Sequence, residues 1–347
     1  MEYVEVDGSR GEGGGQILRT AVAFSAILGR PVRIEKIRGG RQVPGLKRQH
    51  VSALRVLANV FAGALEGASE GSSVVTFAPG EQRKEKLSLD MGTAASITLV
   101  LQAVIPAVAL ARSHLDLELV GGTDVPWSPT YDFFAEVVRA AYERIGIEFT
   151  VAASRRGYYP RGGGKVTAAI WPSAGLRPLA LAGKQEVKEV LLVSRCGGLP
   201  RHVAERQLGS ATADLVQAGF GIASTKLTEE QSDSPGSSIL AYHVGPSAYI
   251  GTDGIGAKGK RAEEVGRETA ARFIGAARSG GCFDSNLADM VIPLLSLAPG
   301  ESRVAIPPLT PHLVSGLELA SQFTGCSWSV EEGEGIRTVT VSPSRAR

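Results

Sequence analysis

Residues 100–111 read VLQAVIPAVALA, an apolar run of helix length, and residues 288–298, ADMVIPLLSLA, contain the same VIP followed by small and apolar residues. A third run, ILRTAVAFSAILG at 17–29, can be laid over both. Apolar segments that recur in one register are typical of a repeated structural unit. We therefore interpret the three runs as one helix used three times. Near the helix starts, this register makes three polar residues equivalent: Arg19, Gln102 and Asp289.

Each of the three runs is followed by the same succession of patterns. A short turn leads into a strand-like segment, and a turn marked by glycine or proline then leads into a second amphipathic segment. The strand-like segments are PVRIEKIRGG, LDLELVGGT and SRVAIPPL. The second amphipathic segments are GLKRQHVSALRVLANVFAG, PTYDFFAEVVRAAYERIG and TPHLVSGLELASQFTG, and β-like pairs follow them. The spacing predicts a helix, strand, helix and strands unit that occurs three times.

Residues 183–280 interrupt this repetition with a pattern of their own. KEVLLVSR, GIASTKL, SILAYHV and SAYIGTD have strand character, whereas HVAERQLGSATADLVQAG and KRAEEVGRETAARFIGAA have helical spacing. Insertions are tolerated at surface turns. We predict an α+β fold made of three repeated βαβαββ-type units in a large domain. Repeats one and two occupy 1–182, a small α/β domain is inserted at 183–280 between repeats two and three, and repeat three occupies 281–347.

Composition and charge exclude several classes of protein. The chain has 347 residues, which favours two domains, and a formal net charge of only +2. A nucleic-acid partner must therefore be met by a local basic patch. The three cysteines are widely spaced and form no CxxC pair, which argues against a disulfide framework or a zinc ribbon and indicates a reducing compartment. The acidic start is unlike a signal peptide, and the most apolar stretch, 97–111, is too short to cross a bilayer. We expect a soluble protein with no membrane partner, cytoplasmic or, in a eukaryote, nuclear.

The stretch KIRGGRQVPGLKRQH, residues 36–50, is rich in basic side chains and contains no acidic residue. Its glycines allow the backbone to approach a ligand, and the planar fork of arginine suits two-point binding of phosphate oxygens. A basic loop in isolation is more often simply solvated. The missing carboxylates and the glycines make the two interpretations about equally good.

The stretch RGEGGGQILR, residues 10–19, places Glu12 before three glycines and a helix start. Exposed N–H groups at a helix start favour anions. Glu12 could cap the helix or hold a divalent cation for a nucleotide, and the local pattern favours neither. If the repeats pack around a pseudo-threefold axis, Glu12 and Asp289 approach one another. Two carboxylates together with phosphate oxygens would then form a magnesium site.

Two of the five histidines share a place in the repeat, because His50 and His312 each stand thirteen residues before the glycine that ends the second helix. A histidine at a helix start is usually an ordinary surface residue. The alternative for His312 is a nucleophile that accepts a nucleotidyl group.

The stretch GGTDVPWSPTYDFF, residues 121–134, contains Asp124 and Asp132, one of which we expect to cap the following helix. Pro129, with Trp127 and Tyr131 beside it, could offer an apolar surface to a base. The sequence contains no GxxxxGK[ST], so the P-loop of many nucleotide-binding proteins is absent.

Taken together, these stretches resemble the RNA 3′-terminal phosphate cyclase family nearly from end to end. The resemblance is carried by DGSRGEGGGQILR, IRGGRQVPGLKRQH, GGTDVPWSP, GYYPRGGGKV, PRHVAER, the NLAD segment and the PHLVSG segment, in the family's order. It implies three βαβαββ-type units similar to those of enolpyruvyl transferases, with a small α/β insert.

The resemblance also implies a three-step reaction with ATP. A histidine attacks the α-phosphate of ATP and releases pyrophosphate, and the bound AMP then moves to the terminal 3′-phosphate of an RNA. The neighbouring 2′-OH attacks this activated phosphate, giving a 2′,3′-cyclic phosphate and free AMP. The 2′-OH requirement explains why the substrate must end in a ribose.

Site residues are carried over from the family position by position. The implied catalytic residues are His312, as the nucleophile that carries AMP, and Glu12, Arg19 and Arg41. The implied ATP-binding residues are Gln102, Pro129, Asp289, Asn286 and His312. The implied ligands of the RNA 3′-phosphate are Arg38, Arg41, Gln49 and His50, with Arg19 also among the phosphate-binding positions. The implied ligands of Mg²⁺ or Mn²⁺ are Glu12 and Asp289.

Two positions depart from the family's pattern. Members usually have an aromatic residue or histidine where this chain has Asn286, and glutamine where it has Met290. Loss of a stacking group weakens base binding by about 1 to 3 kcal/mol if stacking here resembles other base–aromatic contacts. These two departures therefore bear on the preference for a purine base and leave the triphosphate chemistry unaffected.

Two other functions compete with this one. A cyclase-like factor of ribosome biogenesis shares the fold but lacks the nucleophilic histidine, so the presence of His312 with Glu12, Arg19 and Arg41 argues against it. An enolpyruvyl-type transferase of small molecules would also use a basic loop, but it does not explain the motifs above.

Overall fold

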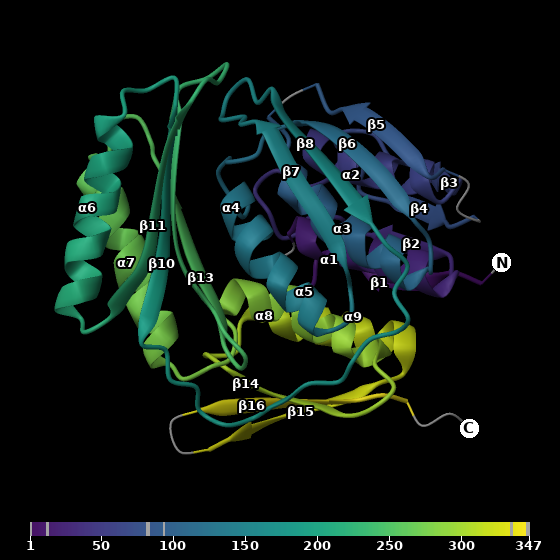
Figure 1. Ribbon diagram of the computed structural model, residues 1–347. Coiled ribbons are helices and arrows are strands. Elements are labelled where there is room, and N and C mark those ends of the chain that lie inside the picture. Colours follow the sequence, from purple (N-terminus) through teal and green to yellow (C-terminus); the bar gives the residue numbers. More distant parts are fainter. Residues whose placement is uncertain (1, 12–13, 81–83, 93, 334–335, 345–347) are drawn as a thin grey trace.

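The computed structural model describes residues 2–11, 14–80, 84–92, 94–333 and 336–344, and within them the strands form four sheets of four strands each (Figure 1). Every sheet contains both parallel and antiparallel pairs. The prediction of a fold that combines helices with small sheets is thus confirmed, since the structure is mixed α/β with small mixed sheets.

The first unit follows the order strand, helix, strand, helix, strand, strand. It consists of β1 (Val4–Asp7), α1 (Gly15–Leu28), β2 (Val32–Glu35), α2 (Arg48–Val60), β3 (Ala64–Glu66) and β4 (Val75–Ala78). Its strands lie in the order β1-β2-β4-β3, with β1 and β2 parallel and the other pairs antiparallel.

The second unit has the same connectivity and the corresponding strand order, β5-β6-β8-β7. Its first half consists of β5 (Lys86–Asp90), α3 (Ile97–Leu110) and β6 (Leu115–Gly121). Its second helix is continuous in space but changes pitch, from α4 (Tyr131–Phe133) through a π-helical stretch (Phe134–Val138) to α5 (Arg139–Arg144). The strands β7 (Phe149–Arg155) and β8 (Gly164–Ile170) complete it.

The third sheet has the same order again, β9-β14-β16-β15. Its members are β9 (Ala180–Leu181), α8 (Ser285–Val291), a 3-10 helix (Ile292–Leu297), β14 (Ser302–Ile306), α9 (Pro311–Thr324), β15 (Ser327–Glu332) and β16 (Arg337–Ser342). The segment 288–298, expected as one helix, changes to the tighter 3-10 form at Ile292, where Pro293 has no N–H to donate to the α-helical ladder.

The segment between β9 and α8 forms a separate layer, at the left of Figure 1. It consists of β10 (Glu189–Gly197), α6 (His202–Gln217), β11 (Gly221–Glu230), β12 (Gly236–Val244), β13 (Tyr249–Ile255) and α7 (Ala262–Arg278). The sheet order is β11-β10-β12-β13, and α6 and α7 pack on one of its faces. Because β9 pairs with β14, this segment follows the first strand of the third sheet, whereas the sequence interpretation had placed all of repeat three after it.

The hydrophobic core lies where helices of the three units meet. Helix α1 packs against α3 and α9, and most of α3 is buried, including Pro106. A helix that is apolar on nearly all sides must lie inside the protein. The inserted segment has a smaller core of its own, formed by α6, α7 and the sheet that they cover.

A buried ion-pair network joins the inserted segment to the second unit. Arg156, with a side chain only 3% exposed, donates to Asp124 Oδ2 at 3.1 Å and to Asp132 Oδ1 at 2.7 Å. Arg195 on β10 donates to Asp132 Oδ2 at 2.7 Å. The expectation that Asp124 or Asp132 caps a helix is wrong. The Thr130 hydroxyl caps α4 instead, because both carboxylates are engaged by arginines.

None of the helices in the described ranges is long and apolar enough to span a membrane. Cys196, Cys282 and Cys326 are buried free thiols.

Replacement of Arg156 by alanine is expected to lower the free energy of unfolding by about 3 to 5 kcal/mol, because it leaves the buried Asp124 carboxylate without its counter-ion and Asp132 with Arg195 alone. Urea unfolding followed by circular dichroism measures the change. The control is Arg303→Ala, which breaks an exposed pair with Glu331 and is expected to cost less than about 1 kcal/mol. Equal losses in the two variants would contradict the assigned role of the network.

Candidate functional site

The turn before α1 lets two other helices approach very closely. A Cβ at Gly15 would lie 2.3 Å from Nε2 of His50 on α2. A Cβ at Gly11, which has φ of 57°, would lie 2.1 Å from Oγ of Ser315 on α9. Both distances are far shorter than real contacts, so a side chain at either position would displace the His50 ring or the Ser315 hydroxyl, and at Gly11 the positive φ adds backbone strain. Glu12, between them, lies outside the described residues.

Three helix N-termini therefore meet at this turn. Helix α1 begins at Gly15, α2 brings His50 in its first turn, and α9 brings His312 as its second residue. The side chain of Gln16 links two of them by donating from Nε2 to the His312 carbonyl at 3.4 Å. Each N-terminus presents N–H groups and the positive end of a helix dipole. Such a place favours phosphate oxygens.

The three residues that the repeat register makes equivalent line one cavity of about 40 Å³. Arg19 reaches it from α1, Gln102 from α3 and Asp289 from α8. Asp289 is also tied to the start of α9, because the Thr310 hydroxyl donates to its Oδ1 at 2.5 Å. Thr310 caps α9 by accepting from the Leu313 N–H at 2.9 Å. The helix start that carries His312 is thereby fixed beside the cavity.

Burial separates the charge states of Arg19 and His50. It lowers the pKa of Arg19 to about 10, so the guanidinium stays protonated at neutral pH. Burial, followed by the charges of Arg19, Arg38 and Lys47, lowers the pKa of His50 to about 3. The Nδ1 atom of His50 accepts from the Lys47 N–H at 3.1 Å, so the neutral ring carries its proton on Nε2. The site thus combines a half-buried cation with a neutral N–H donor.

The basic loop 36–50 divides into an inward and an outward part. Arg38, with φ of 55°, turns inward and donates to the carbonyls of Val43 at 2.7 Å and Gly45 at 3.1 Å. Arg41 and Gln49 are exposed, and a Cβ at Gly14 would lie 3.9 Å from Nη2 of Arg41. The loop therefore packs over the start of α1. Arg38 holds its backbone, and Arg41 presents the charge.

The remaining predicted residues lie on the α3 and α8 sides of the site. The Pro129 carbonyl accepts from the Thr98 hydroxyl at 2.8 Å, which places this turn at the start of α3, one helical turn from Gln102. On α8, Asn286 is exposed and Met290 lines the cavity. Sequence reasoning missed Gln16, Ser315 and Thr310. Only Thr310 carried a signal, as a threonine before Pro311 at a helix start.

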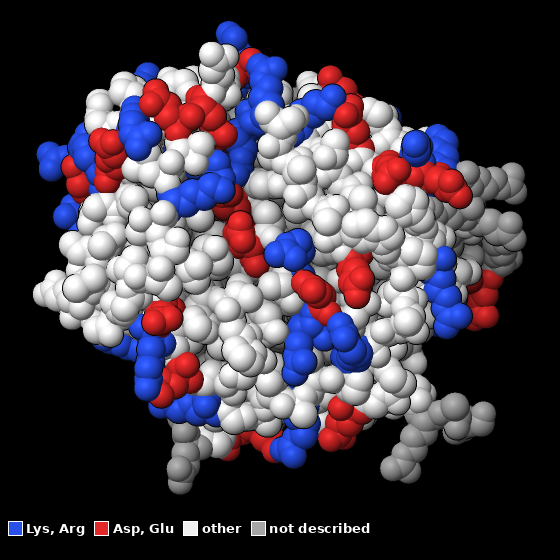
Figure 2. All heavy atoms as spheres, in the orientation of Figure 1, with Lys and Arg blue, Asp and Glu red and all other residues white. Residues whose placement is uncertain are grey.

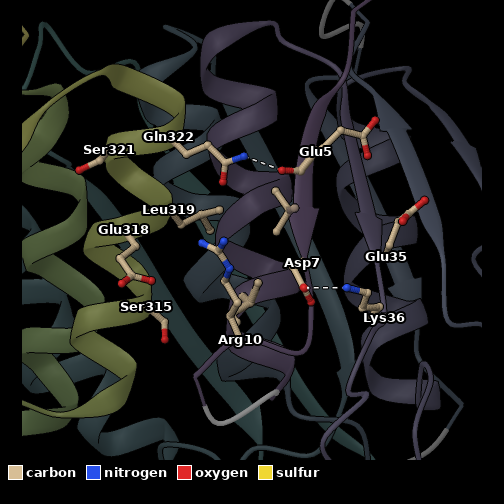
Figure 3. Close-up of a pocket in the computed structure, with 12 residues that line it drawn as sticks. Glu5, Asp7, Arg10, Glu35, Lys36, Ser315, Glu318, Leu319, Ser321 and Gln322 are labelled. Carbon is tan, nitrogen blue, oxygen red and sulfur yellow. Dashed lines mark hydrogen bonds and ion pairs between the residues drawn. The ribbon is translucent and has the colours of Figure 1, made fainter.

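A larger cavity, of about 630 Å³, lies between β1, β2 and α9 (Figure 3). Arg10 points into it, and Lys36 pairs with Asp7 at 3.1 Å. The other charged groups that line it are carboxylates, namely Glu5, Glu35 and Glu318. Because acidic groups outnumber basic ones, this cavity disfavours phosphate.

The face shown in Figure 2 also has no extended basic surface, since Lys and Arg are intermixed there with Asp and Glu. The convergence of helix N-termini therefore remains the best phosphate site among the described residues.

Replacement of His50 by asparagine is expected to flatten the acid dependence of stability. The folded-state pKa lies below the unfolded value, so the unfolded chain takes up the proton first. Stability is lost as pH falls from about 6.5 towards 3, by up to about 1.4 kcal/mol per unit. Asparagine keeps an acceptor near Nδ1 but does not titrate. Urea unfolding at pH 7, 6 and 5 compares the two proteins, and parallel curves would show that His50 protonates normally in the folded state.

Comparison with known proteins identifies relatives over nearly the whole chain. Residues 10–330 match the model of a family described as RNA 3′-terminal phosphate cyclase. A protein of that description from Pyrococcus furiosus is 41% identical over 332 residues, which cover 95% of this chain and 96% of the relative. One from Thermococcus gammatolerans is 42% identical over 333 residues, with 95% of each chain covered.

One solved structure matches at a much lower level. An EPSP synthase from Acinetobacter baumannii matches with a TM-score of 0.27 and 12% identity, over 93% of this chain and 61% of that chain.

Proposed function

The chain belongs to the RNA 3′-terminal phosphate cyclase family, and from that premise we propose that it converts an RNA 3′-phosphate to a 2′,3′-cyclic phosphate with ATP, using His312 as the covalent carrier of AMP. The observation that carries the proposal is the convergence of three helix N-termini on one glycine turn, with His312 on one of them and Arg19 beside it. This arrangement suits a reaction in which every step moves a phosphoryl group.

In the first step a ring nitrogen of His312 attacks the α-phosphorus of ATP. A nitrogen–phosphorus bond forms, and the bond from phosphorus to the bridging oxygen breaks as pyrophosphate leaves. Arg19 and the N–H groups of α1 and α9 would offset the charge of the phosphates. Neutral His50 would donate from Nε2 to a phosphate oxygen. Because its Nδ1 is not protonated, the ring carries no second proton that could be lost during the reaction.

In the second step an oxygen of the RNA 3′-phosphate attacks the AMP phosphorus and releases His312. In the third, the 2′-OH of the same ribose attacks the 3′-phosphorus, loses its proton and expels AMP. Adenylylation is needed because an oxygen of a phosphate monoester is a poor leaving group, whereas AMP is a good one. Arg41 and Gln49, exposed beside the start of α1, would hold the RNA phosphate, and Arg38 would keep their loop in shape.

The residues present fit a divalent cation only in part. Mg²⁺ is usually held by one or two carboxylates and by phosphate oxygens of the substrate. Within the described ranges no cluster of three acidic, His or Cys ligands forms, but Asp289 offers a carboxylate at the cavity. We propose Asp289 and Glu12 as the ligands of Mg²⁺ or Mn²⁺, which when bound would offset the charge of departing pyrophosphate.

The adenylylation assay tests the nucleophile. Incubation with ATP labelled at the α-phosphate and Mg²⁺ is expected to leave acid-labile label on the wild-type chain and none on His312→Ala. His114→Ala is the matched control and should label normally. This histidine directly precedes β6 and pairs with Asp116 of that strand. Label that persists in His312→Ala would overturn the assignment. A wild-type chain that takes no label would instead favour a non-catalytic cyclase-like factor of ribosome biogenesis.

RNA binding is expected to depend only modestly on salt, because few cations contact the RNA terminus. For single strands the slope of log K against log salt is about 0.7 per neutralised phosphate. Arg41→Gln should remove about one phosphate contact and so reduce the slope by about 0.7. It should lower the affinity for all 3′-phosphorylated sequences alike. Fluorescence anisotropy with a 3′-phosphorylated oligoribonucleotide measures both effects, and a slope above about 5 would contradict a short footprint.

A further inference from the structure

Strand β13 of the inserted segment makes a direct hydrogen bond to the Pro129 turn. The Asp253 carboxylate accepts from the Thr130 N–H at 2.6 Å. Thr130 follows Pro129 and caps α4, so its backbone conformation determines where that turn and the helix meet. The other side of the turn is held by the Thr98 hydroxyl.

The same strand also holds the start of α8. Two residues before Asp253, the Gly251 N–H donates to Asp284 Oδ2 at 2.9 Å. Asp284 caps α8 by accepting from the Leu287 N–H at 3.0 Å, and α8 carries Asn286 and Asp289. A second bond nearby, from the Tyr249 N–H to the Cys282 carbonyl at 2.7 Å, continues this attachment.

Contact with α4 leaves β13 little freedom. A Cβ at Gly251 would lie 2.8 Å from the Phe133 ring, so the strand backbone packs directly on that side chain. Burial raises the pKa of Asp284 to about 7, and the charge of Asp253 makes a smaller contribution. One short strand thus contacts both the Pro129 turn and the α8 start.

We propose that Asp253 is a positioning residue through which the inserted segment sets the separation of the Pro129 turn and α8, and thereby the affinity for the nucleotide. This inference rests on the proposed function, because Pro129, Asn286 and Asp289 line the nucleotide site only if that proposal holds. Asp253 itself does not belong to the residues that line the cavity of Arg19.

The test compares Asp253→Ala with Asp253→Asn, which keeps an oxygen acceptor for the Thr130 N–H. We expect the alanine variant to raise KM for ATP in adenylylation five- to twentyfold, with kcat at saturating ATP changed less than twofold. KM for the 3′-phosphorylated oligoribonucleotide should stay unchanged, and asparagine should restore KM for ATP to within twofold of wild type. Glu263→Ala is the matched control, since its pairing with Arg206 lies wholly within the inserted segment.

Several outcomes would overturn the inference. An unchanged KM for ATP in Asp253→Ala, equal effects of alanine and asparagine, or a parallel rise in KM for ATP and RNA would each do so. If Asp253→Ala does not fold, Gly251→Ala replaces it, because its Cβ forces β13 away from Phe133 and should raise KM for ATP selectively. A wild-type chain that takes no AMP label would defeat the proposed function, whereas normal labelling with an unaltered KM in the variants would defeat this inference alone.

Discussion

The structure depends on the absence of a side chain at the turn before α1. A Cβ at Gly15 would lie 2.3 Å from Nε2 of His50, and one at Gly11 would lie 2.1 Å from Oγ of Ser315 on α9. Because these positions carry no side chain, the N-termini of α1, α2 and α9 meet without displacing either residue. Helix dipoles of the same sign repel one another, so such a meeting is stabilised when an anion lies between them. The packing constraint and the capacity for phosphate thus have the same origin.

Burial then gives each polar group at this meeting point a defined charge state. Arginine keeps its proton even when water is removed, because its ordinary pKa is far above neutrality. Histidine has no such margin, and the neighbouring cations add to the cost of protonating His50. The result is a fixed positive charge at Arg19 and a neutral donor at His50. A preorganised arrangement of this kind changes little as phosphoryl groups move.

The inserted segment is coupled to this centre in two ways. Arg195 on β10 donates a hydrogen bond to the buried carboxylate of Asp132. Separating the inserted segment from the second unit would therefore leave buried charged groups without their partners. Strand β13 in turn holds the Pro129 turn and the cap of α8. The insertion follows β9 and therefore enters the third unit directly before α8. Because the inserted segment ends just before α8 begins, it can affect the position of the helix that carries Asp289.

Local patterns in the sequence were enough to predict helices, strands and the equivalence of Arg19, Gln102 and Asp289, and these three residues do line one cavity. Periodicity reports which face of an element is apolar, and a repeated register carries that information to corresponding places. Local patterns could not predict that Arg38 turns inward, that Thr130 rather than an aspartate caps α4, or that Asp253 reaches the Pro129 turn. The turn of Arg38 depends on how its own loop folds back, since its partners are only five and seven residues away. The other two depend on which partner lies opposite, and for Thr130 and Asp253 the bonded residues are 123 positions apart. Hydrogen bonds between distant segments follow from packing, and only the tertiary structure decides them.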